Sequence, residues 1–458
     1  MKFLKTKTKT KLIIFIAIFL FSIIIYLFSI VSNIVSEGYD KQNKTIEFVK
    51  SIIPSHYIKK IKDNLFIASN LKAKNKILEL QLKKYEQGYE GQKFDTRTVK
   101  LNDTNYEVNS FFLPFKRLDV NLGWNAEMNS LRAHYAEIND DNIFLISGEG
   151  KTIFFNKNNL RSNKLDFKIL PNNISLILKD NNFQLIGIRD LYFHDDEIFI
   201  SMMTKDEKGI TINIYVADLN FENLEFEIFF QTNEYWNKYN VFSGGRIERF
   251  DNKNILFSIG FFNVKNAAQE VNSLLGKIIK INLDSKESKI ISIGHRNPQG
   301  LKYIKDENLI INSEHGPKGG DEINFNKLDE GKKTKNFGWD IASYGTKYDG
   351  TDPYKKSHSK YGFEEPIKYY VPSIGISEVL YLENNSFCMK KCLWTTSLRA
   401  NSIYVSSINK NFDQLIPEGR IFLKGNRIRD IDYDKELDQI ILVSENIPSL
   451  LSLKRIEN

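Results

Sequence analysis

Cysteine and histidine are scarce in this chain, which has two cysteines and six histidines among 458 residues. The cysteines, Cys388 and Cys392, form the sequence CMKKC, and no further Cys or His stands near them at the spacing of a metal site. A local disulfide is the better interpretation if this part of the chain lies outside the cytoplasm. The three-residue spacer between two strand-like runs would suit a staple at a hairpin end.

Acidic residues are missing from the first part of the chain, where no Asp or Glu precedes Glu37. Five lysines occupy the same stretch, at positions 2, 5, 7, 9 and 11. The 64 Lys and Arg against 57 Asp and Glu leave a net charge of +7, and removing these five lysines leaves +2. The chain therefore lacks the basic surface that nucleic acids require, and we expect no nucleic-acid partner.

One long apolar run stands in a chain that otherwise lacks them. Leu12 to Val31 contains no charged residue and has the length of a helix that crosses a bilayer. A cleaved signal peptide is the alternative, but the apolar run is long and SIVSNIVSEGYD offers no clean cleavage site. We expect a basic cytoplasmic tail (1–11) and a transmembrane helix (12–31). This single-pass anchor would lie in the inner (cytoplasmic) membrane, with the rest of the chain periplasmic or extracellular.

Helical periodicity is confined to the segment after this run. LKAKNKILELQLKKYEQ carries apolar residues at helical spacing with Lys and Glu between them, which predicts a short amphipathic helix. We expect residues 32–105 to form a partly helical juxtamembrane stalk. A coiled-coil dimer is an alternative for which the pattern is short.

Residues 106–458 are built from short apolar runs bounded by Asn, Asp, Gly or Lys. Examples are NIFLIS, EIFISMM, NILFSIG and QIILVS, which read as strands with turns between them. Few segments are long enough for helices, so the pattern predicts an all-β sandwich, barrel or propeller. About 350 residues would divide into six four-stranded blades of about 58 residues each, although no sharp internal repeat is visible.

Polar residues gather among glycines in GHRNPQG, which follows the strand-like KIISIG. Arg296 offers a planar fork of donors that suits carboxylates and quinone oxygens, and Asn297 adds a neutral donor and acceptor. Taken alone, the loop is better explained by a structural role in which Arg296 pairs with a nearby acid.

A second polar string, EHGPKGGDEIN, begins at Glu314. Its Gly316-Pro317 step fixes a bend, and Asp321 and Glu322 supply hard oxygen ligands. Calcium accepts six to eight mixed carboxylate and carbonyl oxygens, so this string could form a calcium site. The alternative is a solvated turn capped by acids.

Two further strings place arginines near the C-terminus. TSLRAN contains Arg399, and GNRIRDI contains Arg427 and Arg429. Alternation along a strand puts Arg427 and Arg429 on one face. Two like charges there need an anion between them or acids on a neighbouring strand.

Taken together and in this order, the strings resemble the signature of the soluble quinoprotein sugar dehydrogenases, the glucose/sorbosone and aldose sugar dehydrogenase family. AQEVNSLLGKIIKIN, NFGWD, YGTKYDG and PSIGIS add to the resemblance. It implies a six-bladed β-propeller, and an activity that oxidises the anomeric carbon of a sugar or similar small molecule with pyrroloquinoline quinone (PQQ) and calcium. The electron acceptor is left open.

The resemblance also assigns roles to residues of this chain. Basic and amide side chains would contact PQQ: Arg296, Asn297, Arg399, Arg427 and Arg429. The carbonyls of Gly316 and Pro317 would hold the calcium that touches PQQ. Asp321 and Glu322 would serve this region, including a second, structural calcium.

The pattern breaks at the general base. The family places a His four residues before the Arg of a Gly-Gly-Arg strand start, whereas YNVFSGGRIERF has Phe242 there. A phenyl ring cannot take the proton of a sugar hydroxyl as an imidazole can. Arg189 and Asp190 stand where the family supplies Gln or Glu beside PQQ. Asp190, His194 and Glu248 are conceivable replacement bases, and the alternative function is a propeller that binds a carbohydrate or other anionic ligand without turnover.

Overall fold

The structure, a computed structural model, describes residues 90–115, 131–236, 242–329, 331, 333–349 and 354–456. The predicted tail (1–11), transmembrane helix (12–31) and most of the stalk lie outside these ranges. Within them, none of the helices has the length and apolar character needed to span a membrane.

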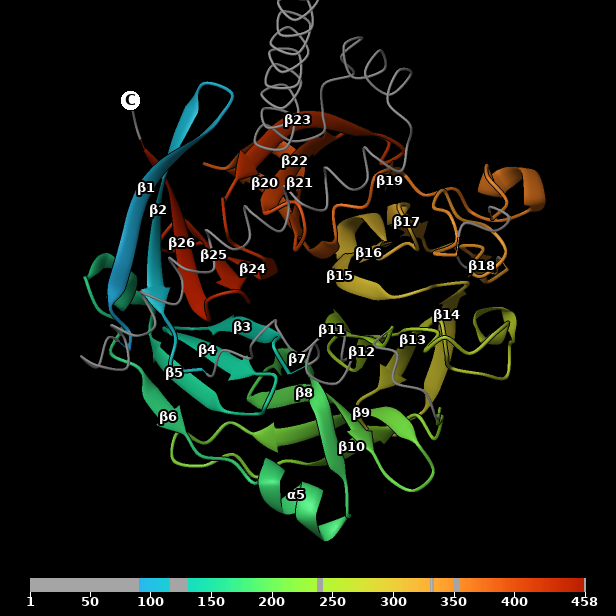
Figure 1. Cartoon of the computed structure of the whole chain (residues 1–458), viewed down its shortest axis with the longest axis horizontal. Helices are drawn as coiled ribbons and strands as arrows, with labels where there is room; N and C mark the ends of the chain where they lie inside the picture. The colour runs from blue at the N-terminus through green and yellow to red at the C-terminus, as the bar shows by residue number, and fades with distance from the viewer. Residues whose placement is uncertain are drawn as a thin grey trace, which may run out of the picture. The chain divides into compact units, whose positions relative to one another are not determined.

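Six sheets surround a central axis, so the six-bladed β-propeller predicted from the sequence is confirmed (Figure 1). The first sheet contains β3 (His134–Asn139), β4 (Asn142–Ser147), β5 (Thr152–Asn156) and β6 (Lys168–Leu170). The second contains β7 (Gln184–His194), β8 (Glu197–Lys205), β9 (Ile210–Asp218) and β10 (Glu227–Gln231). The third contains β11 (Gly244–Asp251), β12 (Asn254–Ile259), β13 (Lys277–Asn282), β14 (Ser288–Ile293) and the added β18 (Lys335–Asn336).

The fourth sheet contains β15 (Pro298–Ile304), β16 (Leu309–Glu314), β17 (Asp321–Lys327) and β19 (Lys368–Tyr370). The fifth contains β20 (Ile376–Asn385), β21 (Cys388–Ser397), β22 (Ser402–Ile408) and β23 (Leu415–Phe422). The sixth contains β24 (Ile428–Asp434), β25 (Gln439–Ser444), β26 (Ser449–Ile456), β2 (Thr104–Phe112) and β1 (Lys93–Leu101). Helical segments are short: α5 (Ile174–Asp180), η1 (Lys157–Arg161), η2 (Ala267–Gln269), η3 (Lys305–Glu307) and η4 (His358–Tyr361).

The sixth blade joins the two ends of the propeller, because β2 pairs with β26 along its whole length. The structure therefore places β1 and the start of β2 within residues that the sequence assigned to the stalk (32–105). The strand β1 is an edge strand in which polar residues alternate, and only Leu101 is buried. Its sequence lacks the apolar run by which the other strands were recognised.

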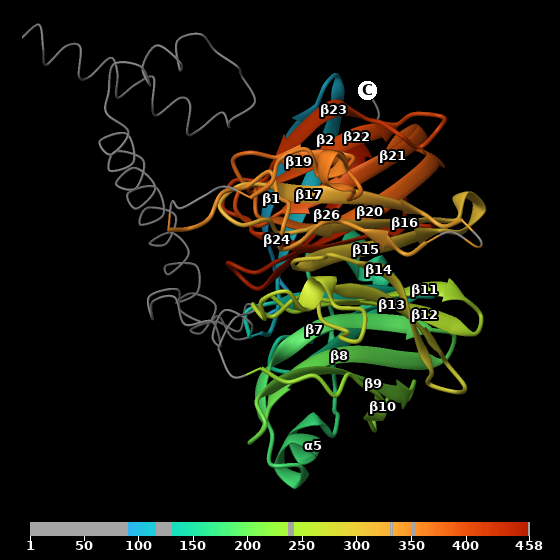
Figure 2. The same ribbon diagram turned by 90° about the vertical axis from the view of Figure 1, so that its right-hand side faces the viewer.

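The blades bury apolar residues on both faces. NIFLIS in β4 and QIILVS in β25 are almost continuously buried, because each sheet face packs against a neighbouring blade. Figure 2 shows such neighbouring sheets side by side, with β11–β13 next to β7 and β8. Each large apolar side chain removed from water contributes about 1.5–3 kcal/mol. These apolar contacts between blades hold the inner strands in a closed ring, which consists of β3, β7, β11, β15, β20 and β24.

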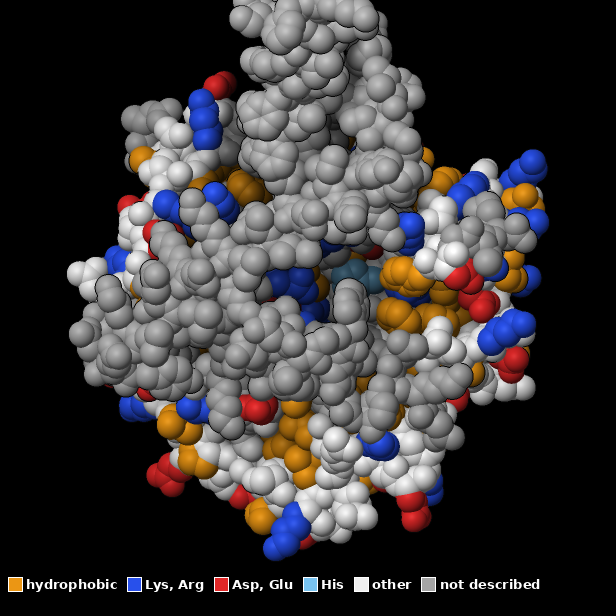
Figure 3. Space-filling view, in the orientation of Figure 1, with side chains coloured by type: hydrophobic (Ala, Val, Ile, Leu, Met, Phe, Trp, Pro, Cys, Tyr) orange, Lys and Arg blue, Asp and Glu red, His pale blue; other side chains and the backbone are white. Residues whose placement is uncertain are grey.

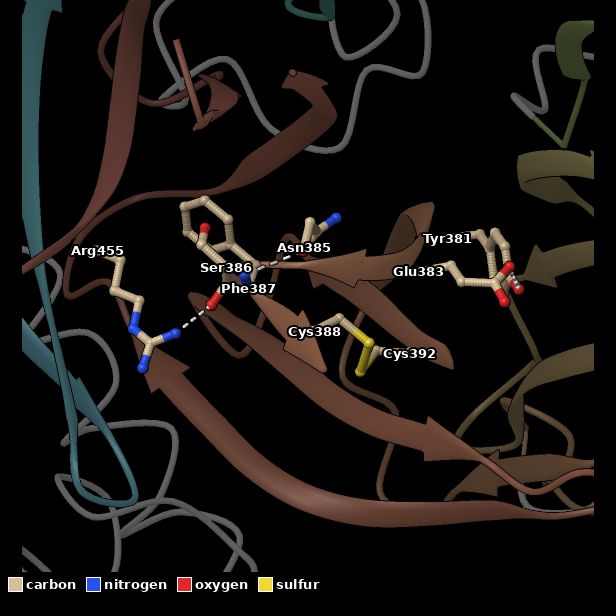
Figure 4. Close-up of a disulfide and its surroundings, with 8 residues drawn as sticks. All are labelled: Tyr381, Glu383, Asn385, Ser386, Phe387, Cys388, Cys392 and Arg455. Atoms are coloured by element: carbon tan, nitrogen blue, oxygen red, sulfur yellow. Dashed lines mark hydrogen bonds between the residues drawn. A yellow bond between two sulfur atoms is a disulfide. The ribbon is translucent and has the colours of Figure 1, made fainter. Parts of the chain in front are cut away.

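The two cysteines form a disulfide, as their spacing suggested (Figure 4). Both lie in β21, and their Cα atoms are 5.9 Å apart, whereas four steps of a regular strand would span about 13 Å. The register explains the difference, since Asn385 pairs with Cys388 while Glu383 pairs with Lys391, which leaves a bulge between them. The disulfide thus closes a bulge directly after the hairpin turn, and Met389 in this bulge is 80% exposed.

Candidate functional site

The sequence-predicted site residues lie at one end of the propeller axis. Asn297 precedes β15, Arg427 precedes β24, Arg399 follows β21 and Gly316 follows β16. In an antiparallel blade, the start of the first strand and the end of the second lie at the same edge. Basic and histidine side chains are visible together near the centre of one face (Figure 3).

Arg246 on β11 fills the axis below this end and is 6% exposed. Its guanidinium carbon lies 4.8 Å from the centre of the Tyr135 ring, and its Nε donates to the Gln299 carbonyl at 2.8 Å. It meets carboxylates on three blades: Asp190 on β7 at 2.5 Å, Glu378 on β20 at 2.6 Å and Asp430 on β24 at 2.8 Å. The Arg246 side chain therefore contacts the inner strands of all five other blades.

The three carboxylates around Arg246 outnumber the one positive charge that they share. Burial raises the pKa of Asp190 to about 7 and that of Glu378 to about 8, although Arg246 lowers both. Glu248, considered as a replacement base, instead pairs with Lys302 at 3.0 Å. Asp190 is likewise engaged below the site, and His194 lies at the far end of β7, away from Asn297 and Arg427. None of the three conceivable replacement bases reaches the predicted cofactor residues.

Arg296 lies in an aromatic enclosure. Its guanidinium carbon is 4.2 Å from the Phe242 ring centre, 5.1 Å from Trp339 and 6.0 Å from Phe261. Its Nη1 donates to the His315 carbonyl at 2.8 Å, while its buried Nε has no hydrogen-bond partner in the described part of the chain. The nearby acid that a purely structural role would require does not pair with it there.

Glu314 supports this loop from below. Its Oε2 accepts the backbone N–H of Arg296 at 2.6 Å, and its Oε1 accepts the Asn324 amide at 2.7 Å and lies 3.1 Å from His295 Nδ1. His295 Nε2 lies 2.8 Å from Ser292 Oγ. Burial opposes ionisation of Glu314, but the His295 ring and the backbone N–H groups lower its pKa below the ordinary value. This buried set fixes the backbone that presents Arg296 and Asn297.

Arg427 and Arg429 share an acid from the neighbouring strand. This is one of the two arrangements expected for two like charges on one strand face. Glu445, just after β25, lies 2.5 Å from Arg429 Nη2 and 3.4 Å from Arg427 Nε. Burial opposes ionisation of Glu445, but the arginines lower its pKa to about 2. Arg429 also donates to Gln299 Oε1 at 2.6 Å, and Gln299 donates to Asn297 Oδ1 at 3.1 Å. Arg429 and Asn297 therefore belong to one hydrogen-bond network.

Arg399 stands slightly apart from this network. It follows β21 on an exposed turn and has no ion pair among the residues that the structure describes. The Arg427 guanidinium reaches the carbonyl of the preceding Leu398 at 3.4 Å, which places the Arg399 turn beside Arg427. The structure thus brings all five predicted cofactor residues to the same end of the axis.

The predicted calcium loop is held by its own acid. Asp321 Oδ1 accepts the Gly316 N–H at 3.1 Å, and Oδ2 accepts the Ser373 hydroxyl at 2.6 Å and the Gly375 N–H at 2.8 Å. Glu322 lies 3.6 Å from the buried His358, and burial together with Glu314 raises its pKa well above the ordinary value. Within the described ranges, no three His, Cys, Asp or Glu side chains form a metal-binding group.

The sequence analysis missed three parts of the site. They are the hub formed by Arg246 and its three carboxylates, the support of the Arg296 backbone by Glu314, and the pairing of Glu445 with Arg427 and Arg429. Glu314 adjoins HGP in the string already singled out, so its position offered a signal. The other two depend on contacts between blades that no local spacing encodes.

Comparison with known proteins shows which protein family this chain resembles. A family model described as Glucose / Sorbosone dehydrogenase matches residues 186–451. The aldose sugar dehydrogenase YliI of Escherichia coli strain K12 is 33% identical over 227 residues, covering 46% of this chain and 59% of that protein. The chain therefore aligns with less than two thirds of this curated relative.

Solved structures resemble the propeller at low identity. The soluble aldose sugar dehydrogenase of Escherichia coli, in its apo form, has a TM-score of 0.58 and 20% identity and covers 76% of this chain and 99% of its own. The PQQ-bound aldose sugar dehydrogenase of Streptomyces coelicolor has a TM-score of 0.52 and 17% identity and covers 76% of this chain and 98% of its own. At these identities, the likeness establishes the fold.

Proposed function

Because the chain belongs to the glucose/sorbosone dehydrogenase family of PQQ-dependent sugar dehydrogenases, we propose that it binds PQQ and oxidises the anomeric carbon of an aldose. The observation that carries this proposal is the Arg296 guanidinium, which lies between aromatic rings at the axis end and has no acidic partner among the described residues. A buried cation without an acid calls for an anionic ligand. Flat rings beside it suit a planar one.

The residues present fit PQQ, a tricarboxylate ortho-quinone. Arg296 and Asn297 would contact it from the β15 side, and Arg427 and Arg429 from the β24 side, with Arg399 at the rim. When bound, PQQ supplies the two-electron acceptor for sugar oxidation. Arginine forks match carboxylates in pairs of hydrogen bonds, so these side chains would bind and orient the cofactor. Phe242 and Phe261 would exclude water from the Arg296 side.

Calcium is a second part of the proposal. The family resemblance puts it on the carbonyls of Gly316 and Pro317. The hydrogen bonds of Asp321 argue that this acid shapes the loop and is a weaker candidate for direct ligation. Glu322 is the better acidic candidate, since a cation beside it would relieve its raised pKa.

We also propose that residues 12–31 anchor the chain in the inner membrane with the propeller on the periplasmic or extracellular side. The Cys388–Cys392 disulfide supports this placement, since oxidising compartments favour such bonds.

The test uses the full-length chain with calcium and PQQ. The quinone absorbance spectrum is recorded before and after a panel of aldoses is added. Bleaching of the quinone by a sugar is the expected result. Arg296→Met should abolish PQQ binding, whereas Arg249→Met, which removes an exposed arginine, should not. Absence of PQQ binding to the unaltered chain would overturn the proposal.

A second candidate function is supported by Phe242. A propeller that binds an anionic or carbohydrate ligand without turnover needs no general base, and Phe242 provides none. Tight PQQ binding without bleaching by any aldose would favour this alternative. EGTA treatment in the same assay tests calcium, since its removal should weaken PQQ binding.

A further inference from the structure

Arg189 on β7 is a buried arginine that lacks an acidic partner in the described part of the chain. It is 5% exposed, and its Nε donates to the Ser243 hydroxyl at 2.9 Å. That neutral contact is the only hydrogen bond of its side chain among the described residues. Buried arginines are ordinarily paired with acids, so Arg189 calls for another explanation.

The neighbouring strand leaves room for this side chain. Gly245 has a φ of +113°, and a Cβ atom there would lie 2.4 Å from Arg189 Cβ. Any larger residue at position 245 would displace Arg189. Ser243 is fully buried and offers its hydroxyl to the guanidinium. The space beside Gly245 and the neutral hydrogen bond to Ser243 therefore hold Arg189 in place. Neither contact neutralises its positive charge, which can still pair with an anion.

The acids nearest to Arg189 are already engaged. Asp190 and Asp430 pair with Arg246, and Glu445 pairs with Arg429. Burial lowers the pKa of Arg189; Tyr135 and Glu445 oppose this shift, and Arg429 and Arg246 add to it. A buried cation held only by a neutral hydrogen bond gains from a negative group beside it.

The resemblance puts Arg189 beside PQQ, but on a different side from the other arginines. Arg189 contacts Ser243, the residue after Phe242, and the resemblance puts Phe242 at the place of the family's base, which acts on the sugar. The proposed cofactor residues approach from β15, β21 and β24, whereas Arg189 approaches from β7.

We propose that Arg189 binds an anionic group carried by the substrate, so that the preferred substrate is an acidic sugar bearing a carboxylate or a phosphate. This inference rests on the proposed function. It replaces the neutral aldose expected from the family by an anionic one and names Arg189 as the residue that selects it.

The experiment measures sugar binding by calorimetry to the full-length chain saturated with PQQ and calcium. The probes are D-glucuronate, D-glucose 6-phosphate and neutral D-glucose. We expect at least one acidic sugar to bind tenfold or more tightly than glucose, and the stronger of the two identifies a carboxylate or phosphate. Arg189→Gln should remove this preference, Arg189→Lys should retain part of it, and the exposed-site control Arg249→Gln should leave it unchanged.

A PQQ absorbance titration of the same samples separates the two proposals. If the unaltered chain binds PQQ but shows no preference for either acidic sugar, the inference is overturned while the proposed function stands. A preference that persists in Arg189→Gln overturns it as well. Loss of PQQ binding in Arg189→Gln, with the sugar preference unchanged, would assign Arg189 to the cofactor instead. If the unaltered chain binds neither PQQ nor sugar, both proposals fail.

Discussion

The ring of Phe242 lies 4.2 Å from the guanidinium carbon of Arg296. The residue that the family resemblance puts at the position of the base therefore packs against an arginine that we assign to the cofactor. Such a cation–π contact contributes about 0.5–2 kcal/mol, depending on burial. Phe261 extends the arrangement, because its ring stacks on Phe242 with centres 5.6 Å apart. Phe242 thus contributes a ring contact that positions Arg296, where the resemblance would place a proton acceptor.

Restoring the base should raise activity. A positioned general base typically contributes about 10²–10⁴-fold to rate, so Phe242→His should increase aldose oxidation by about 10²-fold or more. The measurement is the rate of quinone bleaching with saturating sugar. Phe242→Leu is the matched control, since it removes the aromatic ring without supplying a base and should not gain activity. A Phe242→His variant that binds PQQ but stays inert would contradict this prediction.

Arg246 should be essential for the stability of the ring. Removing one partner of a buried charge network costs about 3–5 kcal/mol, because the remaining charges stay buried without compensation. Arg246→Met should therefore lower the free energy of unfolding by about that amount, measured by urea denaturation. Arg249 lies on the same strand and pairs only with exposed groups. Arg249→Met should therefore lower the free energy of unfolding by less than about 1 kcal/mol. Equal losses in the two variants would refute the hub role.

Stability should fall as pH rises through neutrality. The pKa values of Asp190 (about 7) and Glu378 (about 8) are raised in the folded state, above about 4 for unfolded carboxyls. The folded chain therefore binds more protons than the unfolded chain between these limits, and the free energy of unfolding decreases with pH there. Glu445 has the opposite sign, but its pKa of about 2 confines its contribution to acid pH.

The measurement is the Tm between about pH 5 and about pH 8, the range in which these two acids titrate. The scan ends there because burial lowers the pKa of Lys277 to about 8, which adds an opposite slope above it. The double variant Asp190→Asn, Glu378→Gln should flatten the curve. A Tm that rises with pH in the unaltered chain would contradict this prediction.

The sequence predicted the parts of the molecule that local pattern encodes. Apolar runs revealed most strands, and GHRN and GNRIRDI marked loops that the structure brings to one end of the axis. The partner of Arg427 and Arg429 was out of reach, since Glu445 meets them only through the β24–β25 register. Arg246 illustrates the same limit, because its partners come from five other strands. The edge strand β1 was missed for a different reason, as it buries little apolar surface.

The disulfide should stabilise the β21 bulge modestly. Chain entropy predicts about 2 kcal/mol for closing so short a loop. Replacing Cys388 and Cys392 by Ser together should lower the free energy of unfolding by about that amount or less, and dithiothreitol should have no effect on this double variant. PQQ binding should be unchanged, since the bulge lies at the hairpin end of β21 opposite to Arg399. A loss of PQQ affinity in the double variant would contradict this separation.

Glu314 should control cofactor binding without touching the cofactor. Glu314→Gln keeps the size of the side chain but turns an amide toward the Arg296 N–H or the Asn324 amide, where only an acceptor fits. Leaving a buried donor unsatisfied costs about 1–3 kcal/mol, and the loop that presents Arg296 and Asn297 should loosen. We therefore expect PQQ to bind about tenfold more weakly, which corresponds to about 1.4 kcal/mol. Glu307→Gln removes the same charge from a surface ion pair and serves as the control. If Glu314→Gln lowers stability but leaves PQQ affinity at the control value, the Glu314 set supports the fold and not the site.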